Sequence, residues 1–185
     1  MKRCQWAYNE RLVKYHDEVW GKPEHDERQL YKMLILEGLQ AGLSWDIILK
    51  KEGLYDQALD HFDYHLIASY DDDKYQTLMQ TEGLIKNKLK MKAIIKNAKA
   101  FLEIQKQYGS FDTFIWSYVD NQPIQHHYQS SKDVPSFDDL SAQISKDLKK
   151  HGFSFVGPTI IYSYLQAIGI YNDHEINCDF YVKQI

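Results

Sequence analysis

Cysteine is scarce in this sequence, and both a long hydrophobic run and a signal peptide are missing. No apolar stretch approaches the roughly 20 residues that a membrane-spanning helix needs. The N-terminal segment MKRCQW also lacks the hydrophobic region of a signal peptide. We therefore expect a cytoplasmic protein with no membrane contact. In that reducing compartment the two cysteines, Cys4 and Cys178, are poor candidates for a disulfide and better candidates for burial or metal binding.

Neither sign of charge is in large excess, since 22 basic residues face 26 acidic ones for a net charge of −4. This balance argues against a uniformly basic surface for polyanions but allows local basic patches. The 185 residues, 44% of them hydrophobic, suffice for one domain spanning residues 1–185 with a substantial core. Strand-like alternation, internal repeats and long linkers are not found. We therefore expect an all-α fold.

Helix start and stop signals divide most of the chain into short helices. Residues 1–25 are rich in aromatics without clear periodicity and predict an irregular arm, and residues 124–135 predict a mobile loop. In the first half of the chain, helices are expected to start at Glu27, at Trp45 (ending near Glu52 before a turn at Gly53), after Asp63 and after Asp71. In the second half, they are expected after Asn87 (ending near Gln107), at Ser110 (ending at Pro123) and at Ser136 (ending at Gly152). The last expected helix starts at Pro158, ends at Gly169 and is interpreted as a buried central helix.

A glutamate interrupts the apolar face of the helix expected from residue 27. Leu30 and Leu34 define that face at helical spacing, and Glu37 occupies its next position. A carboxylate directed at a core is costly unless it is paired or has a function. Gly42 ends the helix, so Trp45 in the following helix comes to the same corner. The alternative is a structural glutamate paired to a core tyrosine or lysine.

A basic patch follows the turn at Gly83, with six lysines and no acid as far as Leu102. The pattern there is helix, tight hairpin and helix over about residues 73–107. Hairpin amides and a helix N-terminus can bind an anion, so phosphate-backbone contact is one interpretation. The other is a solvated lysine-rich face. The residues assigned to DNA contact in the first interpretation are Gly83, Lys86, Asn87 and Lys88, and Lys90 is also expected to be exposed.

Each cysteine has a histidine nearby, His16 after Cys4 and His174 four residues before Cys178. Two cysteines and two histidines would complete a closed tetrahedral zinc site and leave no open position for catalysis. Such a site would join the terminal segments 1–20 and 170–180. The alternative is a pair of buried apolar cysteines with surface histidines.

Several unusual segments occur together and in order: RCQW, YHDEVWG, LEGLQAGLSW, FDTFIWSYV followed by NQP, and FSFVGPTIIYSYLQAIG running into NDHEINC. With these segments the chain resembles the 3-methyladenine DNA glycosylase I family over essentially its whole length. The resemblance implies a helix-hairpin-helix glycosylase fold. It also implies one structural zinc ion per chain, bound by Cys4, His16, His174 and Cys178.

The resemblance also implies a pocket for a damaged base. Its residues would be Glu37, Tyr15 and Trp45, with Trp6 and Trp20 as further walls. Two departures from the family pattern are visible. Leu12 replaces a common aromatic three residues before Tyr15, which could loosen one wall, and one residue is missing between Cys4 and His16.

The implied activity is hydrolysis of the N-glycosidic bond of 3-methyladenine in alkylated double-stranded DNA, with the free base as product. Glu37 would be the catalytic residue, and Leu43 would fill the gap left by the flipped nucleotide. No aspartate follows Asn87 on its helix, and Asp112 reads as a helix-start residue. The exposed lysines are expected to bind phosphate rather than form a Schiff base, so we expect a monofunctional hydrolase without lyase activity. The sequence shows no oligomeric interface, and a monomer is assumed. Two alternatives stay open: a non-catalytic, zinc-stapled module that binds DNA structure, and a helix-hairpin-helix glycosylase of other lesion specificity.

Overall fold

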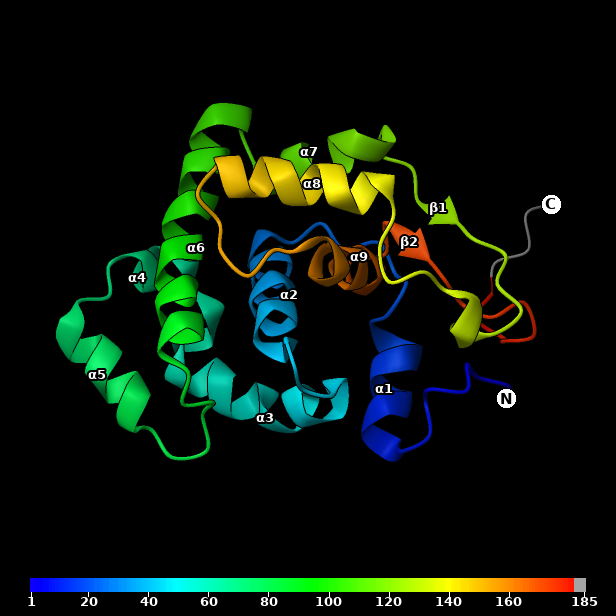
Figure 1. Ribbon diagram of the computed structural model, residues 1–185, viewed down its shortest axis with the longest axis horizontal. Coiled ribbons are helices and arrows are strands. Elements are labelled where there is room, and N and C mark those ends of the chain that lie inside the picture. Colours follow the sequence, from blue (N-terminus) through cyan, green and yellow to red (C-terminus); the bar gives the residue numbers. More distant parts are fainter. Residues whose placement is uncertain (182–185) are drawn as a thin grey trace.

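The computed structural model describes residues 1–181, which form a mainly helical fold (Figure 1). The α-helices are α1 (Glu10–Glu18), α2 (Glu27–Gln40), α3 (Trp45–Ala58), α4 (Tyr64–Ala68), α5 (Asp72–Gln80), α6 (Lys88–Tyr108), α7 (Phe111–Trp116), α8 (Asp139–Lys150) and α9 (Pro158–Ala167). Short 3₁₀ turns cover Asp60–Phe62, Ser117–Val119 and Ser131–Asp133. No helix within the described range has the length and apolar character to cross a membrane.

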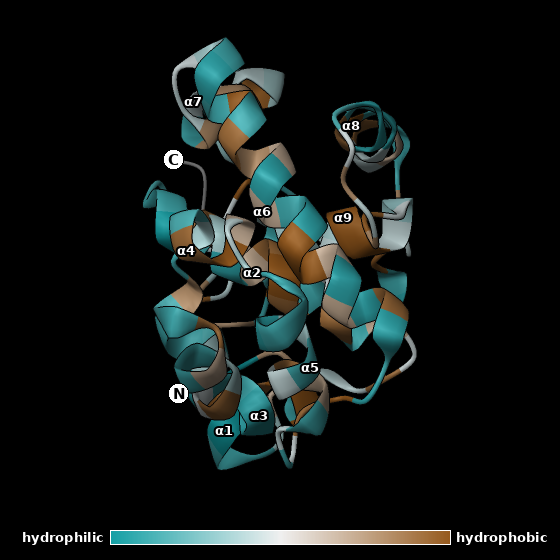
Figure 2. Cartoon of the chain, turned by 90° about the vertical axis from the view of Figure 1, so that its left-hand side faces the viewer, coloured by the Kyte–Doolittle hydropathy of each residue, from teal (hydrophilic) through white to brown (hydrophobic). Residues whose placement is uncertain are grey.

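Helices α2 and α9 lie at the centre and are surrounded by the other helices (Figure 1). Hydrophobic residues gather where α2, α6 and α9 face the interior, and hydrophilic residues cover the outer surfaces (Figure 2). Buried tyrosines join these helices through their hydroxyl groups. Tyr31 of α2 donates to the carbonyl of Ile94 at 2.9 Å, and Tyr164 of α9 donates to the carbonyl of Leu30 at 3.1 Å. The prediction of a buried central helix from Pro158 is therefore confirmed.

Most predicted helix starts are confirmed, and a side chain caps nearly all of these helices locally. Asp26 accepts a hydrogen bond from the amide of Gln29 at 2.9 Å, and Asn87 accepts one from the amide of Lys90 at 3.0 Å. Such caps satisfy amides that have no partner inside the helix, which is why they mark the same positions in sequence and structure. The remaining confirmed starts are capped by Ser44, Asp63, Asp71 and Ser110, and Pro158 lies in the first turn of α9.

Four predicted boundaries are wrong. The helix from Ser110 ends at Trp116 rather than at Pro123, because a 3₁₀ turn follows and Asp120 then adopts a left-handed conformation with a φ of +51°. The arm 1–25 contains α1, whose buried face consists of Leu12, Tyr15 and His16 and so lacks the usual aliphatic pattern. Helix α3 continues through Gly53 to Ala58, because burial of its later turns offsets the roughly 1 kcal/mol cost of glycine in a helix. Helix α8 starts at Asp139 behind the cap Asp138, rather than at residue 136.

The segment expected to be a mobile loop is instead hydrogen-bonded to the C-terminal region. Strands β1 (Ile124–Gln125) and β2 (Tyr171–Asn172) pair in parallel. The amide of Ile124 donates to the carbonyl of Ile170 at 2.8 Å, and that of His126 to Asn172 at 3.1 Å. Two residues per strand are too few for an alternation pattern to be visible in the sequence. The fold is therefore mainly helical with one short strand pair.

Candidate functional site

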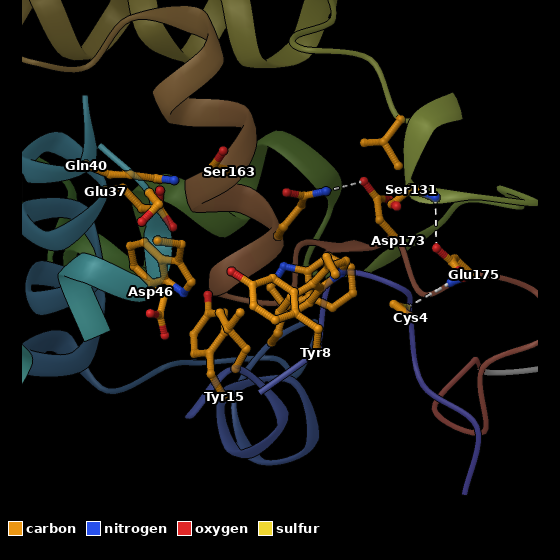
Figure 3. Close-up of a pocket in the computed structure, with 17 residues that line it drawn as sticks. Cys4, Tyr8, Tyr15, Glu37, Gln40, Asp46, Ser131, Ser163, Asp173 and Glu175 are labelled. Atoms are coloured by element: carbon orange, nitrogen blue, oxygen red, sulfur yellow. Dashed lines mark hydrogen bonds between the residues drawn. The ribbon is translucent and has the colours of Figure 1, made fainter. Parts of the chain in front are cut away.

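A pocket of about 410 Å³ opens between α1, α2, α3, α9 and the segment after β1 (Figure 3). All five side chains that the family resemblance assigned to a base pocket line it, together with Leu12. Those five are Trp6, Tyr15, Trp20, Glu37 and Trp45. They come from four separate parts of the chain, so the fold rather than local sequence brings them together.

Aromatic rings form one continuous wall of this pocket. The ring centroids of Trp6 and Trp20 are 4.9 Å apart in an edge-to-face arrangement, and those of Tyr15 and Trp45 are 5.2 Å apart. Trp6 and Tyr15 connect the two pairs at 6.2 Å. The indole Nε1 of Trp45 is buried and has no hydrogen-bond partner among residues 1–181. The wall therefore offers flat, apolar surfaces suited to a planar ligand.

Glu37 is the polar centre of the pocket. Its side chain is only 3% exposed, and Oε2 has no hydrogen-bond partner within the described chain. The structural alternative, a pairing of Glu37 with a core tyrosine or lysine, is not observed among these residues. Burial raises the pKa of Glu37 to about 8. An unpaired carboxyl group of this kind is costly for the fold and indicates a role toward a ligand.

Glu37→Gln should raise the stability of the free protein at high pH. The pKa of Glu37 rises from 4.5 to about 8 on folding, so the folded chain binds this proton more tightly than the unfolded chain. The stability that it contributes is complete below pH 4.5 and is lost as pH rises through 8. We expect the glutamine variant to melt roughly 5 °C or more above the wild type at pH 9, and no higher at pH 4. Thermal melts across this range test the assignment, and a difference independent of pH would contradict it.

Several further pocket residues were not predicted from the sequence, and four polar ones bear on its chemistry. Gln40 lies three residues after Glu37 on the same face of α2, and Ser163 and Gln166 share one face of α9. Because Ser163 and Gln166 are polar residues at helical spacing on the otherwise apolar helix α9, this pair could have been predicted from the sequence. Asp173 follows β2, and no local pattern marks it.

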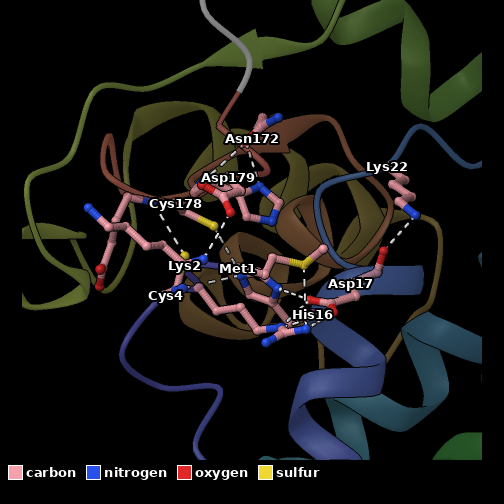
Figure 4. Close-up of polar contacts among 12 residues, drawn as sticks. Met1, Lys2, Cys4, His16, Asp17, Lys22, Asn172, Cys178 and Asp179 are labelled. Atoms are coloured by element: carbon pink, nitrogen blue, oxygen red, sulfur yellow. Dashed lines mark hydrogen bonds and ion pairs between the residues drawn. The ribbon is translucent and has the colours of Figure 1, made fainter.

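Three predicted metal ligands converge where the N-terminal segment meets the C-terminal segment (Figures 1 and 4). The ligand atoms of Cys4, His16 and Cys178 all lie within 4.8 Å of one another, and all three residues are buried. The fourth predicted ligand, His174, lies outside this closest group but beside it, with its ring centroid 4.8 Å from that of His16. His174 is 2% exposed, and its Nε2 has no partner among the described residues.

The surroundings of these residues fit a metal ion. Nδ1 of His16 lies 2.8 Å from an oxygen of Asp17, and Nδ1 of His174 lies 2.8 Å from Oδ1 of Asn172. Nε2 of His174 is thereby left for a ligand role, as acceptors on the other ring nitrogen commonly arrange at metal sites. Nε2 of His16 lies 3.4 Å from the amide nitrogen of Cys4 and 3.5 Å from Sγ of Cys178, so it faces both cysteines. Burial lowers the pKa of both imidazoles, which favours the neutral form that binds metals. Without a cation, burial raises the pKa of the Cys4 thiol to about 12.

The side chains assigned to DNA contact lie on two exposed turns. Leu43 is 37% exposed and follows Gly42, whose φ of +79° allows the turn between α2 and α3. Gly83, with a φ of +85°, shapes the turn between α5 and α6. Asn87 and Lys88 are exposed there, whereas Nζ of Lys86 is bonded to the carbonyls of Met79 and Thr81 at the end of α5.

The prediction that Lys90 is exposed is wrong. Its side chain is buried, and Nζ donates to the carbonyls of Leu39 and Ala41 at 2.9 and 2.7 Å. These carbonyls end α2 and have no partner inside the helix, so the ammonium group caps them. Lys90 thereby links the first turn of α6 to the corner that carries Leu43.

Known proteins with the same fold are closely similar in sequence. The methyladenine glycosylase family model matches residues 6–182. The DNA-3-methyladenine glycosylase 1 of Escherichia coli is 41% identical over 182 residues, 98% of this chain and 97% of that protein. The corresponding enzyme of Haemophilus influenzae is 41% identical over 177 residues, 95% of this chain and 96% of that one.

Solved structures agree with this relationship. A crystal structure of 3-methyladenine DNA glycosylase I matches with a TM-score of 0.94 at 41% identity, covering 98% of this chain and 100% of that one. The Staphylococcus aureus 3-methyladenine DNA glycosylase I, solved to explain its recognition of 3-methyladenine, matches with a TM-score of 0.95 at 37% identity and covers 100% and 99%. The chain therefore belongs to the methyladenine glycosylase family.

Proposed function

We propose that this protein is a DNA repair glycosylase that hydrolyses the N-glycosidic bond of 3-methyladenine in alkylated double-stranded DNA. The unpaired carboxyl group of Glu37 inside an aromatic pocket is the observation that carries the proposal. A module that only binds DNA structure has no use for such a group. The named relatives and the match to an enzyme that recognises 3-methyladenine support the same lesion.

The substrate arrives partly activated. Methylation at N3 places a positive charge on adenine and weakens its bond to the sugar, so little acid catalysis is needed to expel it. The cation favours the ionised form of Glu37, which then accepts hydrogen bonds from the base edge. Trp45 stacks on the face of the charged ring. Neutral adenine gains less from both contacts, which gives discrimination between damaged and normal bases.

Water is the nucleophile in this reaction. No lysine lines the pocket within the described chain, so a Schiff-base step has no amine to start it. Asp112 lies 2.8 Å from Nδ1 of His25 at the start of α7, where it has a local structural role. The enzyme is therefore monofunctional and leaves the DNA backbone intact after the base departs.

The turn between α5 and α6, with α6 itself, acts as the helix-hairpin-helix element that holds the DNA backbone. The exposed residues Gly83, Asn87 and Lys88 contact phosphates, with Lys86 closing the hairpin beside them. Leu43 enters the base stack from the neighbouring turn when the damaged nucleotide leaves it. Phosphate contacts position the duplex, and the pocket reads the lesion.

Cys4, His16, His174 and Cys178 would hold a zinc ion. Its four protein ligands would make it a closed structural site that supplies no chemistry to the bond cleavage. Its effect would be to join the two terminal segments, and the N-terminal segment carries Trp6 into the pocket.

Chromatography of bases released from methylated duplex DNA tests the proposed function. The wild-type protein is expected to release 3-methyladenine, and a denaturing gel of the same reaction should show no strand cleavage. Failure of the folded, metal-replete protein to release any methylated base would favour the DNA-binding module. Release of other lesions without 3-methyladenine would favour a glycosylase of different specificity.

Leu43→Ala is expected to lower the rate of 3-methyladenine release from duplex DNA about tenfold, because the flipped state loses the side chain that fills the vacated stack. Binding of free 3-methyladenine, followed by tryptophan fluorescence, should change little because Leu43 does not line the pocket. Leu66→Ala is the matched control, since Leu66 is 51% exposed on the distant helix α4. Equal losses in free-base binding and in release would contradict the wedge role.

A further inference from the structure

The amide group of Gln166 has only one favourable orientation in the pocket. Gln166 lies on α9, is half-buried and lines the same cavity as Glu37. Its Nε2 donates to Oδ2 of Asp173 at 2.7 Å (Figure 3). The reverse orientation would place the amide oxygen against a carboxylate oxygen, and two acceptors repel one another. Oε1 of Gln166 is therefore turned away from Asp173.

The carboxylate of Asp173 is held in place by two further side chains. It is 2% exposed, and Tyr162 also donates to its Oδ2 at 2.8 Å. Nδ1 of His126 lies 2.6 Å from its Oδ1. Three side chains thus surround a buried carboxylate that can only accept hydrogen bonds, and one of them is Gln166. No side chain or amide of residues 1–181 donates to Oε1 of Gln166, so this oxygen is free for a ligand in the pocket.

Two acceptors therefore enter the cavity from opposite central helices, the carboxylate of Glu37 from α2 and the amide oxygen of Gln166 from α9. An adenine that carries a methyl group at N3 and is still attached to the sugar has N–H bonds only in its 6-amino group. That group has two hydrogens, which matches the two acceptors.

We propose that Oε1 of Gln166 accepts a hydrogen bond from the 6-amino group of the flipped base, and that Asp173 is the positioning residue that fixes this oxygen. The inference rests on the proposed glycosylase function and adds a source of lesion selectivity. Guanine has an oxygen at position 6, which would face Oε1 as a second acceptor. The Gln166–Asp173 pair therefore favours 3-methyladenine over 3-methylguanine.

Gln166→Met tests the acceptor because methionine keeps the length and helix propensity of glutamine but has no amide. We expect kcat/KM for 3-methyladenine release from methylated duplex DNA to fall about tenfold. Release of 3-methylguanine from the same DNA should change less than about threefold, since it gained nothing from Oε1. Gln143→Met, at an exposed position of α8, is the matched control.

Asp173→Asn tests the positioning role. An asparagine can donate to Oε1 of Gln166, which lets the amide turn and present Nε2 to the pocket as a donor. The release ratio of 3-methylguanine to 3-methyladenine should then rise above that of Gln166→Met, an effect that loss of packing alone does not produce. Thermal melts of each variant record folding separately.

If the release ratio of 3-methylguanine to 3-methyladenine in Gln166→Met stays within about twofold of the wild type, the inference is overturned, because the base then makes no hydrogen bond to Oε1. This outcome differs from failure of the proposed function, in which the wild-type protein itself releases no 3-methyladenine. If Asp173→Asn does not fold, the result for Gln166→Met decides alone.

Discussion

Glu37→Gln is expected to lower kcat/KM for release of 3-methyladenine from duplex DNA about 100-fold, the usual effect of removing a buried electrostatic partner from an active site. Glutamine keeps the size and one acceptor oxygen of glutamate but loses its charge. Because the Glu37 side chain is only 3% exposed and lies in a pocket with an aromatic wall, that charge interacts with the cationic base much more strongly than it would in water. The extrahelical state of the damaged nucleotide becomes less populated as a result.

Chromatography of the released base as a function of time measures this effect. Glu103→Gln is the matched control, because Glu103 is exposed on α6 and pairs with Lys106 of the same helix. The same Glu37 variant should be more stable than the wild type at high pH, so a loss of activity could not be attributed to unfolding. Full activity of Glu37→Gln would remove the carboxylate from the mechanism and leave recognition to the aromatic wall and Gln166.

The parts of the fold that were predictable from the sequence are those set by neighbours in the chain. Asp26 and Asn87 cap helices within three residues, so their signal is local and their predictions are confirmed. Helix α1 was missed because its buried positions are Tyr15 and His16 as well as Leu12, side chains directed at a pocket and a ligand cluster rather than at an aliphatic core. Local pattern fails where function replaces ordinary packing.

The candidate site was predictable only in part for the same reason. Helical spacing was enough to mark Glu37 as anomalous, and the helix end at Gly42 brought Trp45 to the same corner. The other aromatic neighbours came from the family resemblance. The contact between Gln166 and Asp173, and the burial of Lys90 against the end of α2, depend on tertiary packing that spacing does not encode. A lysine in a run of charged residues is normally interpreted as solvated. Nothing in the sequence around Lys90 shows that the carbonyl of Leu39, 51 residues earlier in the chain, needs a hydrogen-bond donor.

The second large effect is expected from loss of the metal site. Cys178→Ala should purify without bound zinc, whereas the wild-type protein should carry about one zinc ion per chain. The site would be built from both terminal segments, so its ligands are close together only in the folded chain, and binding energy then contributes directly to folding. We expect the melting temperature of the variant to fall by about 10 °C.

The alternative interpretation, two buried apolar cysteines, makes a different prediction for the same pair of measurements. Replacing a packed cysteine with alanine removes little volume, so the melting temperature would fall by only a few degrees, and the wild-type protein would contain no zinc.

Cys4→Ala should behave like Cys178→Ala because both thiols belong to one ligand cluster. His65→Gln, at an exposed position of α4, is the control for loss of a histidine unrelated to the site. A chelator that removes the metal should lower the melting temperature of the wild type to that of the cysteine variants and leave theirs unchanged. This convergence would separate loss of the ion from loss of packing, since a packing defect persists whether or not a chelator is present.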